Sequence, residues 1–174
     1  DAADLPGPFL KRVRDFKTRG SSGKLNIALD RAPHFTALPE GAPNLKGDLH
    51  FTDSIERMEH AYDDWKNGHF SRDPFQDVMI PTLIDPTMTP TGKHFMSCFV
   101  QYAPPKIEGH DWTDADRDAF GQTCLDQIEK HAPGFKNSVL HVEVRTPREL
   151  EAEVGLTEGN IFQGELTFDQ LLFN

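Results

Sequence analysis

The sequence predicts an α+β domain in which an antiparallel or mixed sheet carries its helices on one face. Two observations support this prediction. Several short stretches alternate apolar and polar residues, as strands do, and two longer stretches have apolar residues at helical spacing. Between residues 48 and 144 these segments follow the order β-α-β-β-α-β, which is typical of a ferredoxin-like core. The length of 174 residues fits a single domain, residues 1–174.

The chain before residue 48 is expected to contribute a short helix, a strand and a loop. Residues 1–20 are polar, with a few apolar residues at roughly helical spacing. Residues 24–29 alternate Leu25, Ile27 and Leu29 with smaller or polar residues, which predicts a strand. The following loop, up to residue 47, holds three prolines and two glycines. A loop of this length usually has a function or covers a surface.

After a short strand at residues 48–51, the first long helix is expected to begin. Asp53 is its predicted N-cap, with Glu56 as the capping-box partner, and Gly68 is its predicted stop. Four apolar residues at helical spacing form the predicted inward stripe: Ile55, Met58, Tyr62 and Trp65.

Two strands are predicted in the middle of the chain. Residues 75–84 form the first, and Pro81 places its end at a sheet edge or a bulge, because proline cannot donate to the ladder. Residues 94–102 form the most apolar strand, and apolar side chains on both of its faces indicate a central position. Cys98 in this strand and Cys124 in the next helix are predicted to be buried free thiols, which favours a reducing compartment.

The last third of the chain is expected to hold a long helix, a strand and a short helix. Thr113 and Asp116 form a capping box for the long helix. A strand is predicted over residues 139–144. Thr146 then caps a short helix, with Glu149 as its capping-box partner. Gly155 ends this helix, since glycine readily adopts the left-handed conformation needed there.

Composition and motif content exclude several classes of function. The net charge of −10 makes nucleic acid an unlikely partner, and none is expected. No metal site is expected either: residues 114–118 resemble a calcium loop, but Ala119 and Leu125 stand where that loop needs glycine and glutamate. No signal peptide is expected, and this sequence holds no apolar run near 20 residues. The expected location is cytoplasmic, with peripheral membrane attachment as the alternative.

The final segment, residues 155–174, is the one around which we expect the site to be built. Gly159 and Gly164 bracket a short loop that could lie flat against a planar or bulky ligand. Thr167 and Gln170 form a predicted capping box. The apolar run Leu171, Leu172 and Phe173 follows, and the sequence stops inside it, from which we expect a fragment of a longer polypeptide.

Four motifs occur in one order along the chain. They are SGKLNIAL at residues 22–29, IPTLIDPTM at 80–88, GKHFMSCFVQYAP at 92–104 and GLTEGNIFQGELTFDQLLF at 155–173. Together they resemble the FAD-dependent phytoene-dehydrogenase-related oxidoreductases of the flavin amine oxidase superfamily. The resemblance is to the subgroup close to the pyridine nucleotide-disulphide oxidoreductase domain-containing protein 2 family, and it covers the chain from about residue 10 onward.

This resemblance implies a substrate-binding domain of a larger flavoenzyme, in which other segments of the same polypeptide bind FAD. The chain has no Gly-x-Gly-x-x-Gly, so it is expected to bind no FAD and to be inactive alone. The sheet face without helices would be a wall for a large apolar substrate, for example an isoprenoid. Desaturase, isomerase and amine-type oxidase chemistry all remain open.

The resemblance also suggests site residues. Lys24 is the catalytic candidate, because related flavin amine oxidases carry a lysine on a comparable strand that holds a water near the flavin. An ammonium group there would stabilise developing negative charge. The alternative for Lys24 is a solvated surface lysine at the start of a strand. The flavin-facing candidates are Gly159, Asn160, Phe162, Gln163 and Gly164. The family often has histidine at the position of Gln163, and an amide cannot take over an acid–base role.

Two further candidates and two other functions complete the predictions. His94 and Tyr102, at the ends of the central strand, are candidate substrate contacts, with purely structural roles as the alternative for both. The chain as a whole is alternatively a free-standing domain that binds a small ligand or a protein without flavin chemistry. A homodimer formed through the exposed sheet face is the other possibility.

Overall fold

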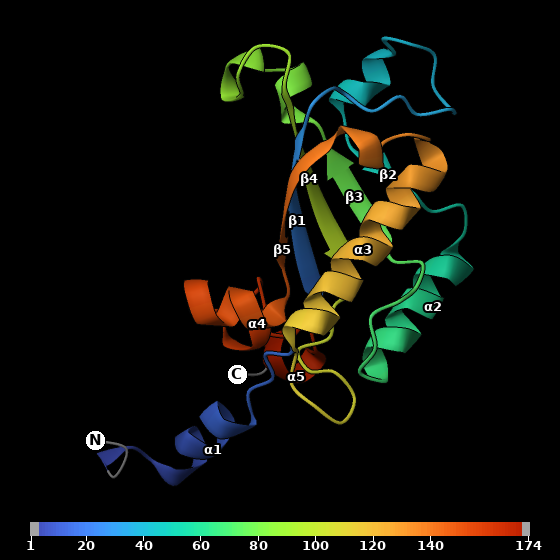
Figure 1. Ribbon diagram of the computed structural model, residues 1–174. Coiled ribbons are helices and arrows are strands. Elements are labelled where there is room, and N and C mark those ends of the chain that lie inside the picture. The colour runs from blue at the N-terminus through green and yellow to red at the C-terminus, as the bar shows by residue number, and fades with distance from the viewer. Residues whose placement is uncertain (1–3, 172–174) are drawn as a thin grey trace.

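A computed structural model describes residues 4–171 and has an α+β architecture (Figure 1). Its centre is a five-stranded sheet with the order β2-β3-β4-β1-β5. The strands are β1 (Ser22–Leu29), β2 (Leu49–His50), β3 (Phe75–Met79), β4 (His94–Gln101) and β5 (Val139–Arg145). The helices are α1 (Gly7–Asp15), α2 (Ile55–Lys66), α3 (Asp114–His131), α4 (Pro147–Glu149) and α5 (Phe168–Leu171).

The α+β class, the antiparallel sheet and the predicted order of elements are confirmed. The ferredoxin-like strand arrangement is wrong in one respect, because β1 lies between β4 and β5 and β2 pairs directly with β3. The physical reason lies in β1. Its Leu25, Ile27 and Leu29 are fully buried in the core, and its backbone pairs with β4 on one side and β5 on the other, so β1 is a central strand of the sheet.

One face of the sheet packs against α2 and α3 and forms the core. Every second residue of the two central strands is fully buried there: Leu25, Ile27 and Leu29 of β1, and Met96, Cys98 and Val100 of β4. Phe120, Cys124 and Ile128 of α3 are also fully buried and belong to the same cluster. The helix positions are four residues apart, which places them on one side of α3.

The start of α2 differs from the prediction by one residue. Ser54 is the N-cap, and its hydroxyl accepts a hydrogen bond from the Arg57 amide at 3.3 Å. Asp53 instead pairs with the Arg57 guanidinium at 3.0 Å, through Nη1. Both residue types cap helices well, so the sequence alone does not distinguish the two positions.

The predicted inward stripe of α2 is partly wrong. Ile55 is 75% exposed and Met58 is 36% exposed, whereas Ala61 and Trp65 are buried. The Trp65 indole donates to the Gly20 carbonyl at 2.9 Å, which ties α2 to the segment that leads into β1. The buried side of α2 is therefore the side of Ala61 and Trp65, and its first turn faces away from the core.

Local sequence signals also explain the end of β3, the starts of α3 and α4, and the end of the turn that follows α4. Strand β3 ends at Met79 rather than at residue 84, because Pro81 begins a 3₁₀ turn, Pro81–Leu83. The predicted capping boxes of α3 and α4 are both present. After α4 the chain forms a π-helical turn, Leu150–Val154, which Gly155 ends with φ of 79°.

At the C-terminal end, the predicted capping box of Thr167 and Gln170 is wrong, because the Thr167 hydroxyl has no hydrogen-bond partner among the described residues and the Gln170 side chain bonds to Lys17. The Oε1 atom of Gln170 accepts from the Lys17 amide at 2.6 Å, and its Nε2 donates to the Lys17 carbonyl at 3.1 Å. The apolar run predicted here is described only at Leu171, which is 56% exposed. Leu172 and Phe173 lie outside the described residues.

Both cysteines are buried free thiols, as predicted. Burial raises the pKa of Cys98 to about 12 and raises that of Cys124 well above its usual value. Because the thiolate is the reactive form, we expect neither thiol to react with an aromatic disulfide reagent in the native protein at pH 8. Both should react after denaturation. Rapid release of one equivalent from the native protein would contradict this arrangement.

Candidate ligand-binding face of the sheet

The second face of the sheet carries no helix over its central strands in the part of the chain that the structure describes (Figure 1). Its central side chains are half-buried by their strand neighbours: Lys24, Asn26 and Ala28 of β1, Phe95, Ser97 and Phe99 of β4, and Phe75 and Asp77 of β3. We call this surface the open face. It combines three aromatic rings with a few polar groups, a composition suited to binding small molecules.

The strand register aligns five residues of the open face in one row. Lys24 of β1 lies opposite Arg145 on one side and opposite Phe99 on the other. Phe99 in turn lies opposite Asp77, and Asp77 lies opposite His50. Residues that face each other across a ladder point to the same side of the sheet. The row therefore crosses the whole sheet from β5 to β2.

Lys24 is half-buried and lies near the middle of this row. Its ammonium group donates a hydrogen bond to the hydroxyl of Ser97 on β4. Among the described residues no carboxylate pairs with it. A lysine held in place by a neutral hydroxyl keeps its positive charge available to a ligand, in contrast to a lysine neutralised by an ion pair.

The charges on the β5 side of the row are largely paired with each other. Glu143 accepts from Asn26 at 2.7 Å and from Arg145 at 2.9 Å. Arg145 also pairs with Glu153 of the π-helical turn at 2.9 Å. Hydrogen bonds from Arg145 and then from Asn26 lower the pKa of Glu143. This side therefore forms an internal polar network, although the Nε atom of Arg145 is buried without a partner.

The β3 side of the row is different, because Asp77 keeps an unsatisfied oxygen. Its Oδ1 is buried and accepts no hydrogen bond within the described chain. The nearest cationic candidate is Nε2 of His50, which lies 3.5 Å away and is close enough for an ion pair but not for a hydrogen bond. The His50 ring also lies 5.2 Å from that of Phe75.

The loop between Gly159 and Gly164 is built around Asn160. This side chain is 6% exposed, and its Nδ2 donates to the Arg19 carbonyl at 3.0 Å. Its Oδ1 accepts from the Phe162 amide at 2.8 Å. Asn160 thus fastens the loop to the segment that leads into β1. Both ends of the Asn160 amide group are therefore engaged in hydrogen bonds within the chain. A direct contact between Asn160 and a ligand stays a prediction, and these internal hydrogen bonds do not favour it.

The other loop candidates are placed differently. Phe162 is 67% exposed, and Gln163 is exposed with φ of 59°. Gly159 is buried, and a Cβ there would meet the Cα of Pro147 at 2.5 Å. Gly164 lies against the ring of Phe16. Of the five loop candidates, Phe162 and Gln163 are therefore the ones whose side chains are accessible.

His94 and Tyr102 do not join Lys24 on the open face. His94 lies at the other end of β4, about 23 Å from Gln101 at the usual rise per strand residue, and its Nδ1 contacts the Thr82 hydroxyl at 3.0 Å. Tyr102 packs on the helix-covered side, with ring centroids 5.3 Å from Tyr62. Burial raises the pKa of Tyr102. For both residues the geometry matches the structural alternative.

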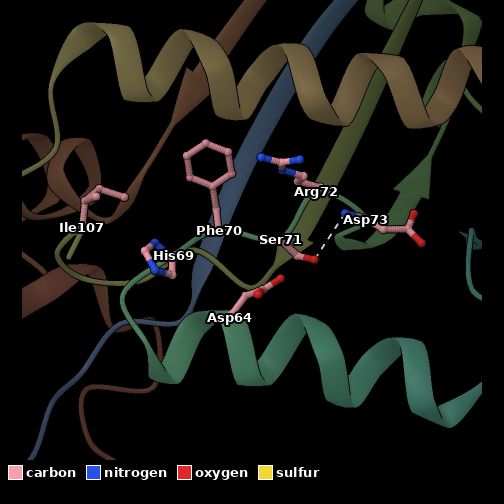
Figure 2. A pocket seen from close by; sticks show the side chains of 7 residues that line it. All are labelled: Asp64, His69, Phe70, Ser71, Arg72, Asp73 and Ile107. Carbon is pink, nitrogen blue, oxygen red and sulfur yellow. Dashed lines mark hydrogen bonds between the residues drawn. The ribbon is translucent and has the colours of Figure 1, made fainter.

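A separate cavity of about 540 Å³ lies between α2 and α3 (Figure 2). It is lined by Asp64, His69, Phe70, Ser71, Arg72, Asp73 and Ile107. Asp73 is already engaged there, since it accepts from Arg57 at 2.7 Å and from Gln127 at 2.9 Å. None of the residues predicted as functional lines this cavity, and it lies on the helix-covered side. We therefore regard the open face as the better candidate site.

Two classes of site find no support within residues 4–171. No group of three or more histidine, cysteine, aspartate or glutamate side chains is arranged to hold a metal ion. In the same range, no helix combines the length and the apolar character needed to cross a bilayer.

Sequence reasoning identified Lys24 but missed its neighbours Ser97, Asp77 and Arg145. Ser97 is a polar residue in the middle of the most apolar strand, Asp77 lies inside β3, and Arg145 ends β5. Their polarity was visible in the sequence. Their common row was not, because register depends on which strands pair, and β1 was not expected between β4 and β5.

Comparison with known proteins finds two rodent proteins that share one name, and a plant isomerase, among the relatives of this chain. The chain is 39% identical over 177 residues to pyridine nucleotide-disulfide oxidoreductase domain-containing protein 2 of rat (Rattus norvegicus). The aligned region covers 97% of this chain and 30% of the rat protein. The mouse (Mus musculus) protein of the same name is 38% identical over 180 residues, with the same shares covered. The chloroplastic prolycopene isomerase of Arabidopsis thaliana is 30% identical over 91 residues, covering 49% of this chain and 15% of that protein.

The chain spans about 30% of the length of the first two of these relatives. No family model matches the chain. The similarity to the rodent proteins includes nearly all the elements described above, from α1 to α5, because it covers 97% of the chain.

Proposed function

Because this chain is related over 97% of its length to a segment of pyridine nucleotide-disulfide oxidoreductase domain-containing protein 2, we propose that it is the substrate-binding domain of an FAD-dependent oxidoreductase. The observation that carries the proposal is Lys24. This half-buried ammonium lies beside Phe99 on a sheet face without helix cover, and a hydroxyl rather than a carboxylate holds it. A cation in that setting is suited to stabilising negative charge that develops on a bound group.

The described residues fit one wall of a flavin site and not the cradle for the nucleotide part of FAD. A dinucleotide cradle needs a parallel strand, a glycine-rich turn and a helix, whereas all strand pairs described here are antiparallel. The Lys24 ammonium donates one hydrogen bond to Ser97 and has further N–H groups for a ligand, and a flavin ring offers acceptors at its edge. In this proposal FAD binds to another domain of the same polypeptide and supplies a two-electron acceptor. This chain orients the substrate and excludes water.

The substrate proposed here is a large and mainly apolar molecule of the isoprenoid kind. Phe75, Phe95 and Phe99 provide an aromatic surface on the open face. The similarity to a protein named for prolycopene isomerisation supports the same class. The choice between desaturase, isomerase and oxidase chemistry depends on residues outside the open face.

The end of the domain formed by α1, α5 and the Asn160 loop is the proposed contact with the FAD-binding domain. Exposed apolar side chains gather in these segments: Leu5, Phe9, Val13, Phe16, Ile161, Phe162, Leu166, Phe168 and Leu171. Exposed apolar side chains in this number are often covered by a partner. A homodimer through the open face stays a separate prediction.

The direct test is the visible absorption spectrum of the full-length natural polypeptide. Flavin bands in the purified protein, or bands that form after FAD is added and persist after gel filtration, are the expected result. A folded protein that stays colourless under both conditions would overturn the flavin part of the proposal. It would leave a binding domain without redox chemistry.

A further inference from the structure

The open face holds two opposite charges that lack a hydrogen-bonded counter-charge within the described residues. One is the Lys24 ammonium, which bonds to the neutral Ser97 hydroxyl. The other is the Asp77 carboxylate, whose Oδ1 is buried and accepts no hydrogen bond. They lie on either side of Phe99, in the same row across the sheet. This arrangement is specific to the β1-β4-β3 part of the face.

The spacing of this pair follows from the sheet. Neighbouring strands lie about 4.8 Å apart, so the backbone positions of Lys24 and Asp77, two strands apart, are separated by about 10 Å. Lys24 and Asp77 form no ion pair with each other among the described contacts, and the Phe99 ring lies between their positions. A ligand lying over Phe99 would therefore meet a donor at one end and an acceptor at the other.

The contrast with the β5 side strengthens this reading. There, Glu143 has two hydrogen-bond donors, and Arg145 pairs with two carboxylates. The domain thus satisfies carboxylates on this face where partners are available. Leaving a buried carboxylate oxygen unpaired costs free energy, typically more than for a neutral group. Such a cost is commonly retained where a ligand supplies the missing donor.

We propose that Asp77 is a specificity-determining residue that accepts a hydrogen bond from a hydroxyl or amine group of an otherwise apolar substrate. This inference rests on the proposed function, because it assigns a substrate class to the same site. The donor group lies about 10 Å from the part of the substrate that faces Lys24, which is two strand spacings. His50, 3.5 Å from Asp77, flanks the group.

This proposal excludes two kinds of ligand from tight binding. A pure hydrocarbon over Phe99 would remove water from Asp77 without replacing its hydrogen bonds, which disfavours binding. A ligand with a carboxylate at that end would be repelled by the charge of Asp77. A hydroxyl or amine at the end of an apolar chain satisfies the carboxylate and keeps the contact with the aromatic rings.

The test uses ¹⁵N-labelled protein and ligands matched in size. Decan-1-ol, decylamine and methyl nonyl ether have the same number of heavy atoms, but the ether has no donor. Each is titrated below its aqueous solubility limit, and the amine also below its critical micelle concentration, and amide shifts in β1, β3 and β4 locate and quantify binding. We expect the alcohol and the amine to bind about tenfold more tightly than the ether, the size of one charge-assisted hydrogen bond.

Two variants assign that preference to Asp77. Asp77→Leu should abolish the advantage of both donors, and Asp77→Asn should reduce the advantage of the amine most, because the charge is lost while an acceptor remains. Asp111→Asn is the matched control, since that side chain is 82% exposed in a loop, and it should leave all three affinities unchanged. The amide spectra also report whether each variant is folded.

The outcomes separate this inference from the proposed function. Equal affinities for the three ligands with clear shifts on the open face would overturn the role of Asp77 and leave apolar binding intact. If Asp77→Leu still binds the alcohol and the amine more tightly than the ether, the role of Asp77 is likewise overturned. If no ligand shifts open-face amides, the proposed substrate-binding function fails together with the inference.

Discussion

A Lys24→Met substitution is expected to lower the reduction potential of the flavin in the full-length polypeptide by about 30–50 mV. The side chain keeps its length and loses its charge. If the flavin ring binds about 8 Å from the ammonium, removing the charge changes the interaction energy with the reduced flavin by roughly 2 kcal/mol at the effective dielectric constant usual for proteins. For a two-electron couple this corresponds to the stated shift. Spectroelectrochemical titration measures it without knowledge of the substrate.

Two matched variants show whether the effect belongs to the position of this charge. Lys106→Met removes a lysine whose side chain is 70% exposed in a loop, and it should leave the potential within a few millivolts of wild type. Lys24→Arg keeps the charge and should retain most of the potential. An unchanged potential in Lys24→Met would place Lys24 away from the flavin and limit its role to substrate contacts or packing.

The local elements of this fold were predictable because each one has its own signal. The capping boxes of Thr113 with Asp116 and of Thr146 with Glu149 were both recognised, and both are formed. Gly155 was recognised as a helix stop and has the expected positive φ. These features depend on residues within one turn of each other, so the sequence contains all that is needed to place them.

The sheet order was not predictable in the same way. Strand β1 showed clear alternation, but nothing in its residues specifies that it lies between β4 and β5. That position is set by long-range packing, in which Leu25, Ile27 and Leu29 must all be buried against α3 and the neighbouring strands. The error also affected the site, because the row that joins Lys24 to Asp77 exists only with β1 beside β4.

The resemblance to a family identified Lys24 and the Asn160 loop, but it did not distinguish contact residues from structural ones. Asn160 was expected near a flavin, and its amide instead holds the loop to the Arg19 carbonyl. A motif contains both structural residues and ligand-contact residues, because a loop must be held in place before its exposed side chains can bind a ligand. Phe162, adjacent to Asn160 and 67% exposed, is the side chain that this fixed loop presents.

A Gly20→Ala substitution is expected to destabilise the protein by about 2–3 kcal/mol, a large cost for the addition of one methyl group. The added Cβ would lie 1.9 Å from the carbonyl oxygen of Glu158, so the backbone itself has to move. No side-chain adjustment relieves this contact. The cost should appear as a lower midpoint of urea denaturation with an unchanged slope.

The contact at Gly20 also links the C-terminal loop to the sheet. Gly20→Ala should therefore destabilise this loop in addition to lowering the stability of the whole domain. Glu158 and Gly159 lie between Gly20 on one side and Pro147 on the other, where a Cβ on Gly159 would meet the Pro147 Cα at 2.5 Å. Moving Glu158 away from Gly20 therefore pushes Gly159 toward Pro147. Amide hydrogen exchange around residues 156–165 should accelerate more than exchange in the core strands.

The control for this prediction is Gly47→Ala. Its backbone conformation is extended, and an added Cβ there would make one ordinary contact, 3.6 Å from the Asn44 carbonyl. We expect a change of less than about 0.5 kcal/mol, as for most surface substitutions. If Gly20→Ala were equally mild, the close packing between the segment entering β1 and the C-terminal loop would be wrong. The loop would then not be held beside the Lys24 end of the sheet, and the proposed arrangement of cation, loop and cofactor would lose its support.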